Sequence, residues 1–221
     1  MSYLPCIEIE PANMKAANAS IIWLHGLGAS GDDFAPVAAQ LKLDDSIAMR
    51  FVFPHAPMRA ITHNGGMQMR AWYDFIINGL DRQINPDDLT QISENISDLI
   101  RREIDRGVPG DRIIIAGFSQ GGAIAYQVAM SSEHKLAGLM AMSTYVPDEN
   151  TIKQSHVDND FLIHIFHGSE DSVVPELLGI QAKKLLEQKG YKPEYSQYAM
   201  EHTVCISQIR DIAAFINKCL A

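Results

Sequence analysis

Short hydrophobic runs alternate with longer stretches of helical periodicity along the whole chain. Five runs are rich in β-branched and large apolar residues and are predicted to be strands; they cover residues 20–25, 49–54, 112–117, 136–143 and 161–168. Most are apolar without interruption, which is typical of parallel strands covered on both faces. The pattern therefore predicts an α/β fold with a mostly parallel central sheet and helices on both faces.

The clearest helical pattern covers residues 86–107 and ends at Gly107. Its apolar positions recur every three or four residues, at Leu89, Ile92, Ile96, Leu99, Ile100 and Ile104. Residues 6–10 alternate between apolar and acidic side chains, which predicts an antiparallel strand at the edge of the sheet. Residues 193–200 are predicted to form the last strand, followed by a final helix over residues 204–220.

One long segment, residues 55–84, shows neither period and is expected to be irregular, with a turn at Gly65-Gly66. It contains several large apolar residues, namely Met67, Met69, Trp72, Phe75, Ile76, Ile77 and Leu80. An irregular segment of this length is uncommon in a compact domain and is usually functional. Residues 60–85 are therefore expected to flank the functional site.

Length and charge limit the classes of protein to consider. The chain has 221 residues, which suits a single domain over residues 1–221. Its formal net charge of −9 disfavours nucleic acid and anionic membranes as partners. No apolar run approaches the roughly 20 residues that span a bilayer, and the first ten residues do not resemble a signal peptide. We expect a cytoplasmic protein without stable membrane insertion, in which Cys6, Cys205 and Cys219 are reduced thiols.

The stretch Gly-Phe-Ser-Gln-Gly at residues 117–121 fits the pattern G-x-S-x-G, with Ser119 at its centre. The pattern alone can occur by chance in a glycine-containing loop. Here it follows a predicted strand directly and precedes a helical pattern, which is the context of a nucleophile elbow. Gly117 and Gly121 leave room for the tight turn, and the start of the helix offers backbone N–H groups beside the serine oxygen. Ser119 is therefore the candidate nucleophile.

A serine nucleophile needs a histidine base and a carboxylate that orients it, in the chain order serine, acid, histidine. The strand over residues 161–168 leads into a loop that contains Glu170 and Asp171. Asp171 is the candidate acid, and Glu170 is its alternative. Either carboxylate could instead be a surface residue or a helix cap.

His202 is the candidate base, because it lies in the loop between the last strand and the final helix, on the side where Ser119 would emerge. The other histidines after the serine suit this role less well. His164 and His167 lie in or at the end of a buried strand, and His134 and His156 lie in polar stretches.

A second glycine pattern, G-x-G-x-x-G at residues 26–31, follows the first long strand. In dinucleotide-binding folds this pattern holds a pyrophosphate, and an acidic residue about 20 positions later binds the ribose. Here the second strand ends in Pro54-His55-Ala56-Pro57 instead. We interpret the loop as part of an oxyanion hole, in which the backbone N–H groups of Leu27 and Gln120 bind the developing negative charge.

Six ordered blocks of the sequence resemble the carboxylesterase, lysophospholipase and acyl-protein thioesterase family of α/β-hydrolases. They are WLHGLGASGDDF, FVFPHAP, NGGMQMRAWYD, GFSQGGAIAYQ, FHGSEDSVVP and MEHTV, and they extend over almost the whole chain. The resemblance implies an α/β-hydrolase fold without a large cap domain and hydrolysis of esters or thioesters through Ser119, Asp171 and His202. It also implies that Leu27 and Gln120 line the oxyanion hole and that the segment around Trp72 borders the acyl site.

The sequence departs from the family at three positions. Many members have an acid at the position of Ala29 and an acid or threonine at the position of Ser169. Many have glycine or proline at the position of Glu201. A carboxylate at position 201 that faced the base would favour the protonated imidazole and raise the pH optimum, whereas one that faced solvent would change little. Neither of the first two departures touches the expected chemistry.

The expected reaction needs no metal and no organic cofactor, since it passes through an acyl-enzyme that water hydrolyses. Met67, Met69, Trp72 and Phe75 are the candidate substrate-binding residues, although they could equally pack the segment onto the core. The substrate could be a lysophospholipid, an acylated protein or a small ester, and exposed apolar residues in this segment could also form a homodimer. The alternatives are a catalytically silent scaffold, a nucleotide-dependent oxidoreductase, and a peptidase or interfacial lipase.

Overall fold

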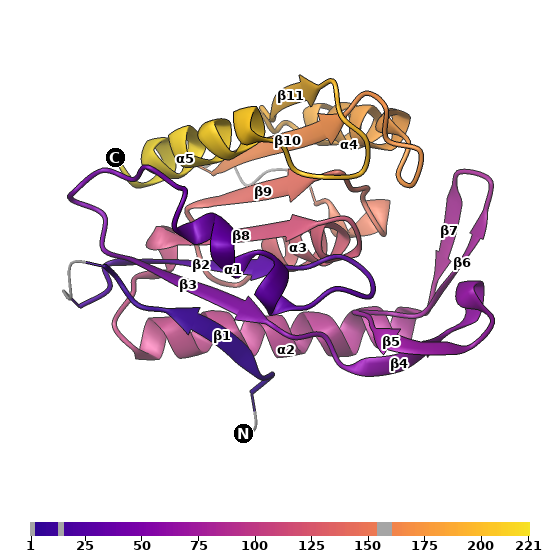
Figure 1. Cartoon of the computed structure of the whole chain (residues 1–221), viewed down its shortest axis with the longest axis horizontal. Helices are drawn as coiled ribbons and strands as arrows, with labels where there is room; N and C mark the ends of the chain where they lie inside the picture. Colours follow the sequence, from indigo (N-terminus) through magenta and orange to yellow (C-terminus); the bar gives the residue numbers. More distant parts are fainter. Residues whose placement is uncertain (1–2, 13–15, 154–160) are drawn as a thin grey trace.

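A seven-stranded sheet forms the centre of the computed structural model, which describes residues 3–12, 16–153 and 161–221 (Figure 1). In spatial order its strands are β1 (Cys6–Ile9), β3 (Met49–Pro54), β2 (Ala19–Leu24), β8 (Ile113–Phe118), β9 (Gly138–Met142), β10 (Leu162–Gly168) and β11 (Glu194–Tyr198). β1 is antiparallel to β3, and every other neighbouring pair is parallel. The mostly parallel sheet and its antiparallel edge strand are confirmed.

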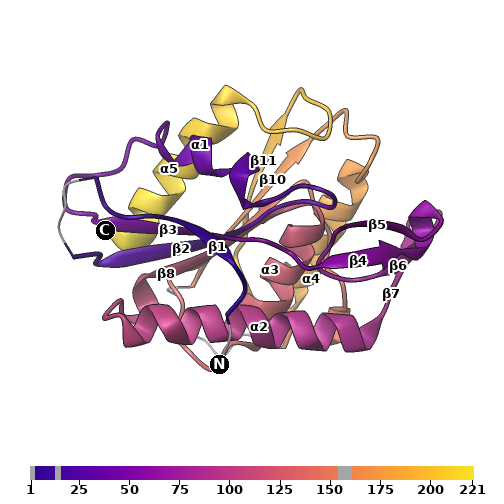
Figure 2. The ribbon, with the colours of Figure 1, turned by 60° about the horizontal axis from the view of Figure 1, so that its bottom comes forward.

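Helices cover both faces of the sheet, as the pattern predicts (Figure 2). One face packs against α2 (Pro86–Asp105), α3 (Gln120–Ser131) and α4 (Glu176–Gln188), and the other against α1 (Ala35–Ala38) and α5 (Ile206–Leu220). Short 3₁₀ helices lie in the connections: η1 (Gly31–Asp33), η2 (Thr62–Asn64), η3 (Gly110–Arg112) and η4 (Glu149–Thr151). The final helix begins at Ile206, two residues after the expected start.

The uninterrupted apolar runs are explained by this double coverage. In β2, Ile22 and Leu24 belong to the core beneath α2 and α3, whereas Ile21 and Trp23 belong to the core beneath α5. All four side chains are fully buried. Because successive side chains of a strand point to opposite faces, a strand with helices on both sides needs apolar residues at every position.

The predicted amphipathic helix is confirmed as α2, and local signals set both of its ends. Asn85 caps the first turn, since its side chain accepts hydrogen bonds from the N–H groups of Asp87 and Asp88 at 3.0 and 3.4 Å. Pro86 occupies the first helical position, where its missing N–H costs no helical hydrogen bond. Gly107 follows the last turn with φ +96°, a left-handed conformation that glycine adopts readily.

The segment 55–84 is not the irregular loop predicted from the sequence. It forms two antiparallel hairpins, β4 (Met58–Ile61) with β5 (Met67–Arg70) and β6 (Phe75–Asn78) with β7 (Asp81–Ile84). Each strand has only four residues, and several of these residues are exposed. The hydrophobic alternation is therefore too short to be recognised in the sequence. Both hairpins lie beyond the carboxyl ends of the parallel strands, at the right in Figure 1.

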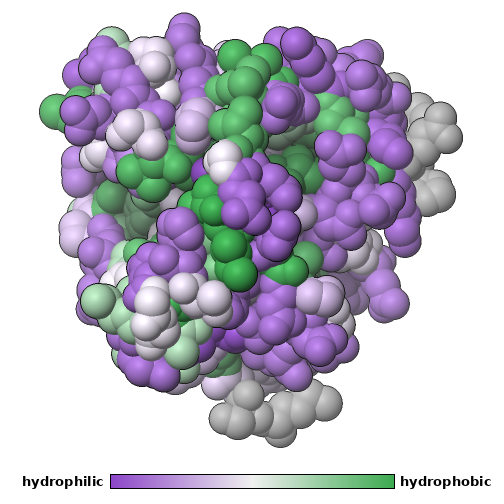
Figure 3. Space-filling view, turned by 90° about the vertical axis from the view of Figure 1, so that its right-hand side faces the viewer, coloured by the Kyte–Doolittle hydropathy of each residue, from purple (hydrophilic) through white to green (hydrophobic). Residues whose placement is uncertain are grey.

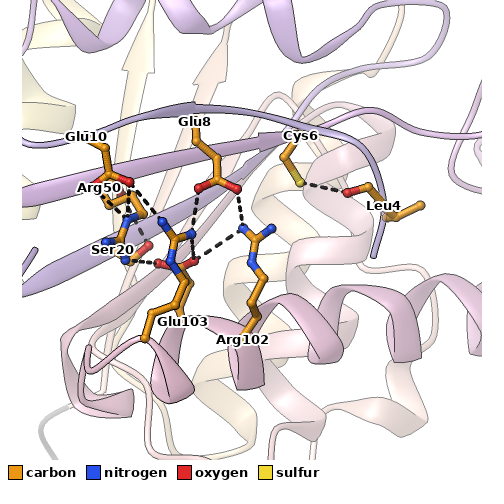
Figure 4. A network of polar contacts seen from close by, with 9 residues as sticks. Leu4, Cys6, Glu8, Glu10, Ser20, Arg50, Arg102 and Glu103 are labelled. Atoms are coloured by element: carbon orange, nitrogen blue, oxygen red, sulfur yellow. Dashed lines mark hydrogen bonds and ion pairs between the residues drawn. The ribbon is translucent and has the colours of Figure 1, made fainter. Parts of the chain in front are cut away.

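An ionic network ties β1 and β3 to α2 (Figure 4). At its centre, the fully buried carboxylate of Glu103 receives hydrogen bonds from Arg50 and Arg106, each at 2.9 Å. Arg50 also binds Glu10 at 2.9 Å, and Arg106 binds Glu8 at 2.6 Å. A buried charge is tolerated only when it is paired and hydrogen-bonded, and here the guanidinium groups of Arg50, Arg106 and, at 3.4 Å, Arg102 meet that need.

We expect Glu103→Gln to lower the free energy of unfolding by about 3 kcal/mol, because it leaves Arg50 and Arg106 without their buried counter-charge. Urea denaturation measures this as a lower midpoint with an unchanged slope. Glu187→Gln is the matched control: it removes an exposed pair with Lys183 on α4 and should cost less than about 1 kcal/mol. Equal losses in the two variants would contradict the role assigned to Glu103.

Candidate active site

Ser119 lies on a sharp turn between β8 and α3, with φ 53° and ψ −121°. The turn is possible because of its glycines: a Cβ at Gly117 would lie 2.2 Å from the carbonyl oxygen of Gly121, and a Cβ at Gly121 would lie 2.4 Å from that of His25. The serine backbone is held on both sides, as its N–H donates to Met142 at 2.9 Å and its carbonyl accepts from Thr144 Oγ1 at 2.6 Å. The structure has the sharp strand-to-helix turn that the sequence predicts, with positive-φ backbone strain at the serine itself.

Asp171 and His202 meet across the ends of β10 and β11, with 2.6 Å between Asp171 Oδ2 and His202 Nδ1. The other carboxylate oxygen, Oδ1, accepts the backbone N–H groups of Val173 at 2.9 Å and Val174 at 2.8 Å. Burial by itself raises the pKa of Asp171, but the hydrogen bonds from His202 and from the two amides outweigh it, so the pKa lies below its ordinary value. The ionised acid accepts a hydrogen bond from the N–H at Nδ1, so the proton of the neutral ring stays on Nδ1 and Nε2 of His202 is free to accept another.

Ser119 and His202 line the same cavity, whose volume is about 270 Å³. Among the described contacts, no hydrogen bond joins the serine hydroxyl to the imidazole; in unliganded enzymes such bonds often form only with substrate. The imidazole also packs against the ring of Phe118, with centroids 4.6 Å apart. The structure thus brings the three predicted residues to one end of the sheet.

The alternative residues lie elsewhere. Glu170 is exposed, whereas its neighbour Asp171 is buried against His202. His164 stacks on Phe166 within β10, and His134 is exposed. His156 lies outside the described residues.

His167 supports the acid loop. Its Nε2 lies 2.8 Å from the carbonyl oxygen of Val174 and 3.7 Å from Asp171 Oδ2, and its ring packs tightly against Gly179. Among the family departures, Glu201 is exposed, and no ion pair with His202 is found among the described residues.

The glycine loop after β2 brings Leu27 to the cavity, which Gln120 at the start of α3 also lines. Neither the backbone N–H of Leu27 nor that of Gln120 has an acceptor among the described residues. Gly28 turns the chain with φ +74° and donates its N–H to Arg70 at 2.8 Å. An oxyanion hole needs two backbone N–H donors without other acceptors beside the nucleophile, so Leu27 and Gln120 remain the predicted donors.

His25 holds this loop from behind. Its Nδ1 lies 2.7 Å from the Gly26 carbonyl oxygen and its Nε2 lies 3.0 Å from the Ala56 N–H, so Nδ1 donates and Nε2 accepts. The side chain is fully buried, and burial lowers the pKa of His25 to about 4. Only the neutral ring can make both contacts, because the Nε2 acceptor is lost on protonation.

The neutral state of His25 predicts a pH-dependent stability. Between pH 6.5 and about 4 the unfolded chain binds a proton at this residue that the folded chain excludes, so stability falls as the pH is lowered through this window. We expect His25 to contribute about 3 kcal/mol to this fall. The measurement is urea denaturation at several pH values for the native chain and for His25→Gln, whose curve should be flatter.

The control for that comparison is His134→Gln, which makes the same substitution at an exposed residue. Its pH profile should match that of the native chain. A His25→Gln profile parallel to the native one would contradict the buried neutral imidazole.

The side chain of Gln120 is turned away from the cavity and joins the elbow to the hairpin segment. Its Oε1 accepts the N–H of Trp72 and its Nε2 donates to the carbonyl of Tyr73, both at 2.8 Å. Trp72 is fully buried, with its indole N–H on the carbonyl of His25 at 2.7 Å. Trp72 therefore supports the site from the core and does not line the cavity.

The four expected substrate-binding residues do not lie together in the structure. Phe75 lines the cavity, but Met67, Met69 and Trp72 do not. Met67 is 63% exposed on β5, and Met69 packs against the core beside Gly28. This part of the expectation needs correction: Met67 and Met69 belong to β5, which contributes no residue to the cavity lining, whereas Phe75 and Ile77 of β6 line it and alternate with the exposed Ile76.

The remaining cavity wall includes Ile77 and Arg82 from the β6–β7 hairpin, Tyr145, and Val173 and Val174 beside the acid. Hydrophobic side chains form a band across this face of the molecule (Figure 3). Arg82, Tyr145 and Val173 are not among the site residues predicted from the sequence. Tyr145 and Val173 follow the carboxyl ends of β9 and β10, a position that could have indicated them.

The other expected features of the site concern metals, membranes and thiols. The described part of the chain has no group of three or more histidine, cysteine, aspartate or glutamate side chains that could hold a metal ion. In residues 3–12, 16–153 and 161–221 we find no helix with the length and apolar character needed to cross a membrane. Burial raises the pKa of Cys6 to about 11 and that of Cys219 to about 12, so both thiols are poor nucleophiles at neutral pH.

Comparison with known proteins gives consistent matches over nearly the whole chain. A sequence profile of the phospholipase and carboxylesterase family matches residues 4–220. The chain is 34% identical over 211 residues to acyl-protein thioesterase 1 of Neurospora crassa, covering 90% of this chain and 86% of that protein. It is 34% identical over 221 residues to acyl-protein thioesterase 1 of Saccharomyces cerevisiae, covering 95% and 96% of the two chains.

Solved structures agree with these matches. The crystal structure of Arabidopsis thaliana SOBER1 has a TM-score of 0.84 to this chain at 27% identity, and the similarity covers 93% of this chain and 100% of that one. The α/β-hydrolase fold expected from the resemblance is thereby confirmed, with no large cap domain in the described residues.

Proposed function

Because the chain belongs to the phospholipase and carboxylesterase family and is a hydrolase of esters or thioesters, we propose that Ser119, Asp171 and His202 form its catalytic triad. The observation that carries this proposal is the 2.6 Å hydrogen bond between Asp171 and His202, at a cavity that the strained elbow residue Ser119 also lines. A nucleophile, a base and an orienting acid in this arrangement are the requirements for acyl transfer.

In the first half of the proposed reaction, Nε2 of His202 takes the proton of Ser119 while the serine oxygen attacks the acyl carbonyl carbon. The carbonyl oxygen becomes negatively charged and is bound by the N–H groups of Leu27 and Gln120. Asp171 stabilises the imidazolium that forms. The imidazolium then protonates the departing alcohol or thiol, and the acyl group remains on Ser119.

In the second half, water enters the cavity and gives its proton to the same nitrogen of His202 as it attacks the acyl-enzyme. The tetrahedral intermediate collapses, the serine oxygen recovers its proton, and the carboxylic acid leaves. His202 accepts and returns the proton in both halves of the reaction, so both halves depend on the tautomer of His202 that Asp171 maintains. Side chains, backbone N–H groups and water supply every group in this scheme.

S-acylated protein cysteines are the natural substrate that we propose first, since two relatives at 34% identity are named acyl-protein thioesterases. Lysophospholipids are the second candidate, because the matching family includes phospholipases. The cavity is slightly smaller than the ~300–1,000 Å³ of typical ligand pockets, so it would enclose only the part of a long acyl chain nearest the carbonyl. Its mostly apolar wall suits an acyl group.

The test uses the purified chain with matched substrates of increasing acyl length: p-nitrophenyl esters, the corresponding thioesters, an S-acylated peptide and a lysophosphatidylcholine. We expect hydrolysis of simple esters and thioesters, and a kcat/KM for the acyl-peptide that exceeds that for the lysophospholipid. The reverse order would make lysophospholipids the substrate. Failure to hydrolyse any of these compounds, with a native circular dichroism spectrum, would overturn the proposal and favour a silent scaffold.

A cytoplasmic location and a homodimer both stay predictions for this chain. The exposed apolar side chains Ile76, Leu80 and Val173 beside the cavity are the surface on which a dimer would be expected. Light scattering coupled to size-exclusion chromatography measures the oligomeric state directly.

A further inference from the structure

The cavity wall contains one feature that ester hydrolysis does not use, the guanidinium of Arg82. Arg82 lies on β7, which with β6 forms the hairpin beside the cavity, and it lines the cavity together with Ser119. It is the only lysine or arginine among the lining residues that the structure describes, and none of those residues is an aspartate or a glutamate. The wall of this mostly apolar space thus includes one residue with a permanent positive charge.

The contacts of Arg82 hold its side chain in place without neutralising it. One terminal nitrogen donates to the carbonyl of Leu80 at 3.1 Å and the other to that of Val173 at 3.3 Å. The guanidinium carbon lies 4.5 Å from the centre of the Tyr145 ring, and the Tyr145 hydroxyl is bound to that of Tyr73 at 2.6 Å. A guanidinium has five N–H donors, and these two carbonyls use two of them.

No carboxylate among the described residues forms an ion pair with Arg82, in contrast to Arg50, Arg59, Arg101, Arg102 and Arg106, which all do. A fixed guanidinium with free donors matches the geometry of a carboxylate, which it can bind through two parallel hydrogen bonds. The small cavity volume requires that such a carboxylate lie only a few bonds from the carbonyl that Ser119 attacks.

We propose that this cavity selects substrates that carry a carboxylate near the scissile ester or thioester, and that Arg82 binds this carboxylate. The inference rests on the proposed function and extends it to a class of substrate. General electrostatic attraction cannot produce such a preference, because the chain has a formal net charge of −9 and repels anions at long range. The selectivity therefore has to come from direct contact in the cavity.

The test compares kcat/KM for two esters of equal chain length, the p-nitrophenyl monoester of adipic acid and p-nitrophenyl hexanoate, after subtraction of the uncatalysed rate. A second pair, 4-acetoxybenzoate and 4-acetoxybenzamide, places the carboxylate in the leaving group instead of the acyl group. We expect the native chain to prefer the anionic member of at least one pair by about tenfold or more. The pair that shows the preference identifies the side of the ester that faces Arg82.

Arg82→Gln should lower this preference by about 10- to 100-fold, the range expected for a hydrogen-bonded charge. The preference of Arg82→Lys should lie between those of the native chain and Arg82→Gln, since lysine keeps the charge but lacks the planar guanidinium with its paired donors. Arg101→Gln is the matched control: it removes the same charge from α2, outside the cavity, and should leave the preference unchanged. The thermal unfolding midpoint of each variant shows whether it is folded.

The outcomes separate this inference from the proposed function. Hydrolysis of the neutral esters without preference for the anionic ones would overturn the inference alone. An equal fall in kcat/KM for both members of a pair in Arg82→Gln would also overturn the inference. Arg82 would then be a structural contact between the hairpin and Val173. Failure of the native chain to hydrolyse any of the four esters would instead contradict the proposed function.

Discussion

Ser119→Ala is expected to lower kcat/KM for ester hydrolysis by about 10⁵-fold, because no other group can form the acyl-enzyme. The variant should fold normally, since the strained backbone of the elbow is held by Met142 and Thr144 and does not depend on the serine hydroxyl. The measurement is steady-state hydrolysis of a p-nitrophenyl ester. A fluorophosphonate reagent should label the native chain at Ser119 and leave the variant unlabelled.

Two further variants make this prediction sharper. His202→Ala should be nearly as inactive as Ser119→Ala, and the double variant no less active than either, because the serine and its base act as one unit. Ser172→Ala, in the exposed part of the acid loop, is the control and should keep native activity. Native turnover or labelling in Ser119→Ala would disprove the mechanism.

Asp171→Asn is expected to lower kcat by about 10⁴-fold with little change in the structure. In the native chain Oδ1 of this residue accepts two backbone N–H groups while Oδ2 faces His202. An asparagine would keep its oxygen on those two amides, so its NH₂ group would face the imidazole and donate to Nδ1. The proton of the imidazole then moves to Nε2, which can no longer accept the proton of Ser119.

The control for this variant is Glu170→Gln, which neutralises the adjacent exposed carboxylate and should leave kcat within about twofold of the native value. Steady-state kinetics near neutral pH are sufficient for both, because the lowered pKa of Asp171 keeps the native acid ionised there. If Glu170→Gln were the damaging substitution, the assignment of the acid would be wrong.

Much of the fold was predictable because the strongest signals in this sequence are local. A strand between two helical layers needs apolar residues at every position, and the runs that became β2, β3, β8, β9 and β10 show this directly. The same holds for the candidate triad: each residue lies just after a strand, and the carboxyl ends of parallel strands meet at one edge of the sheet.

The hairpins were missed because four-residue strands with exposed side chains carry little periodicity. In each hairpin the two strands are stabilised by pairing with each other. The position of the segment depends on contacts with distant residues, such as those of Gln120 with Trp72 and Tyr73. For the same reason Trp72 could not be assigned from sequence: a large apolar side chain suits the core and an acyl site equally well, and only the packing of the chain shows that it is fully buried.

By itself, the sequence determined the α/β class, the strand order along the chain, and the sharp strand-to-helix turn at Ser119, because each depends on residues close together in the chain. Only the tertiary structure decided which of two adjacent acids meets His202, which residues of the hairpins line the cavity, and that Arg82 lines this cavity together with Ser119. These facts depend on distances between residues far apart in sequence, and such distances are set by how the sheet, helices and hairpins pack together.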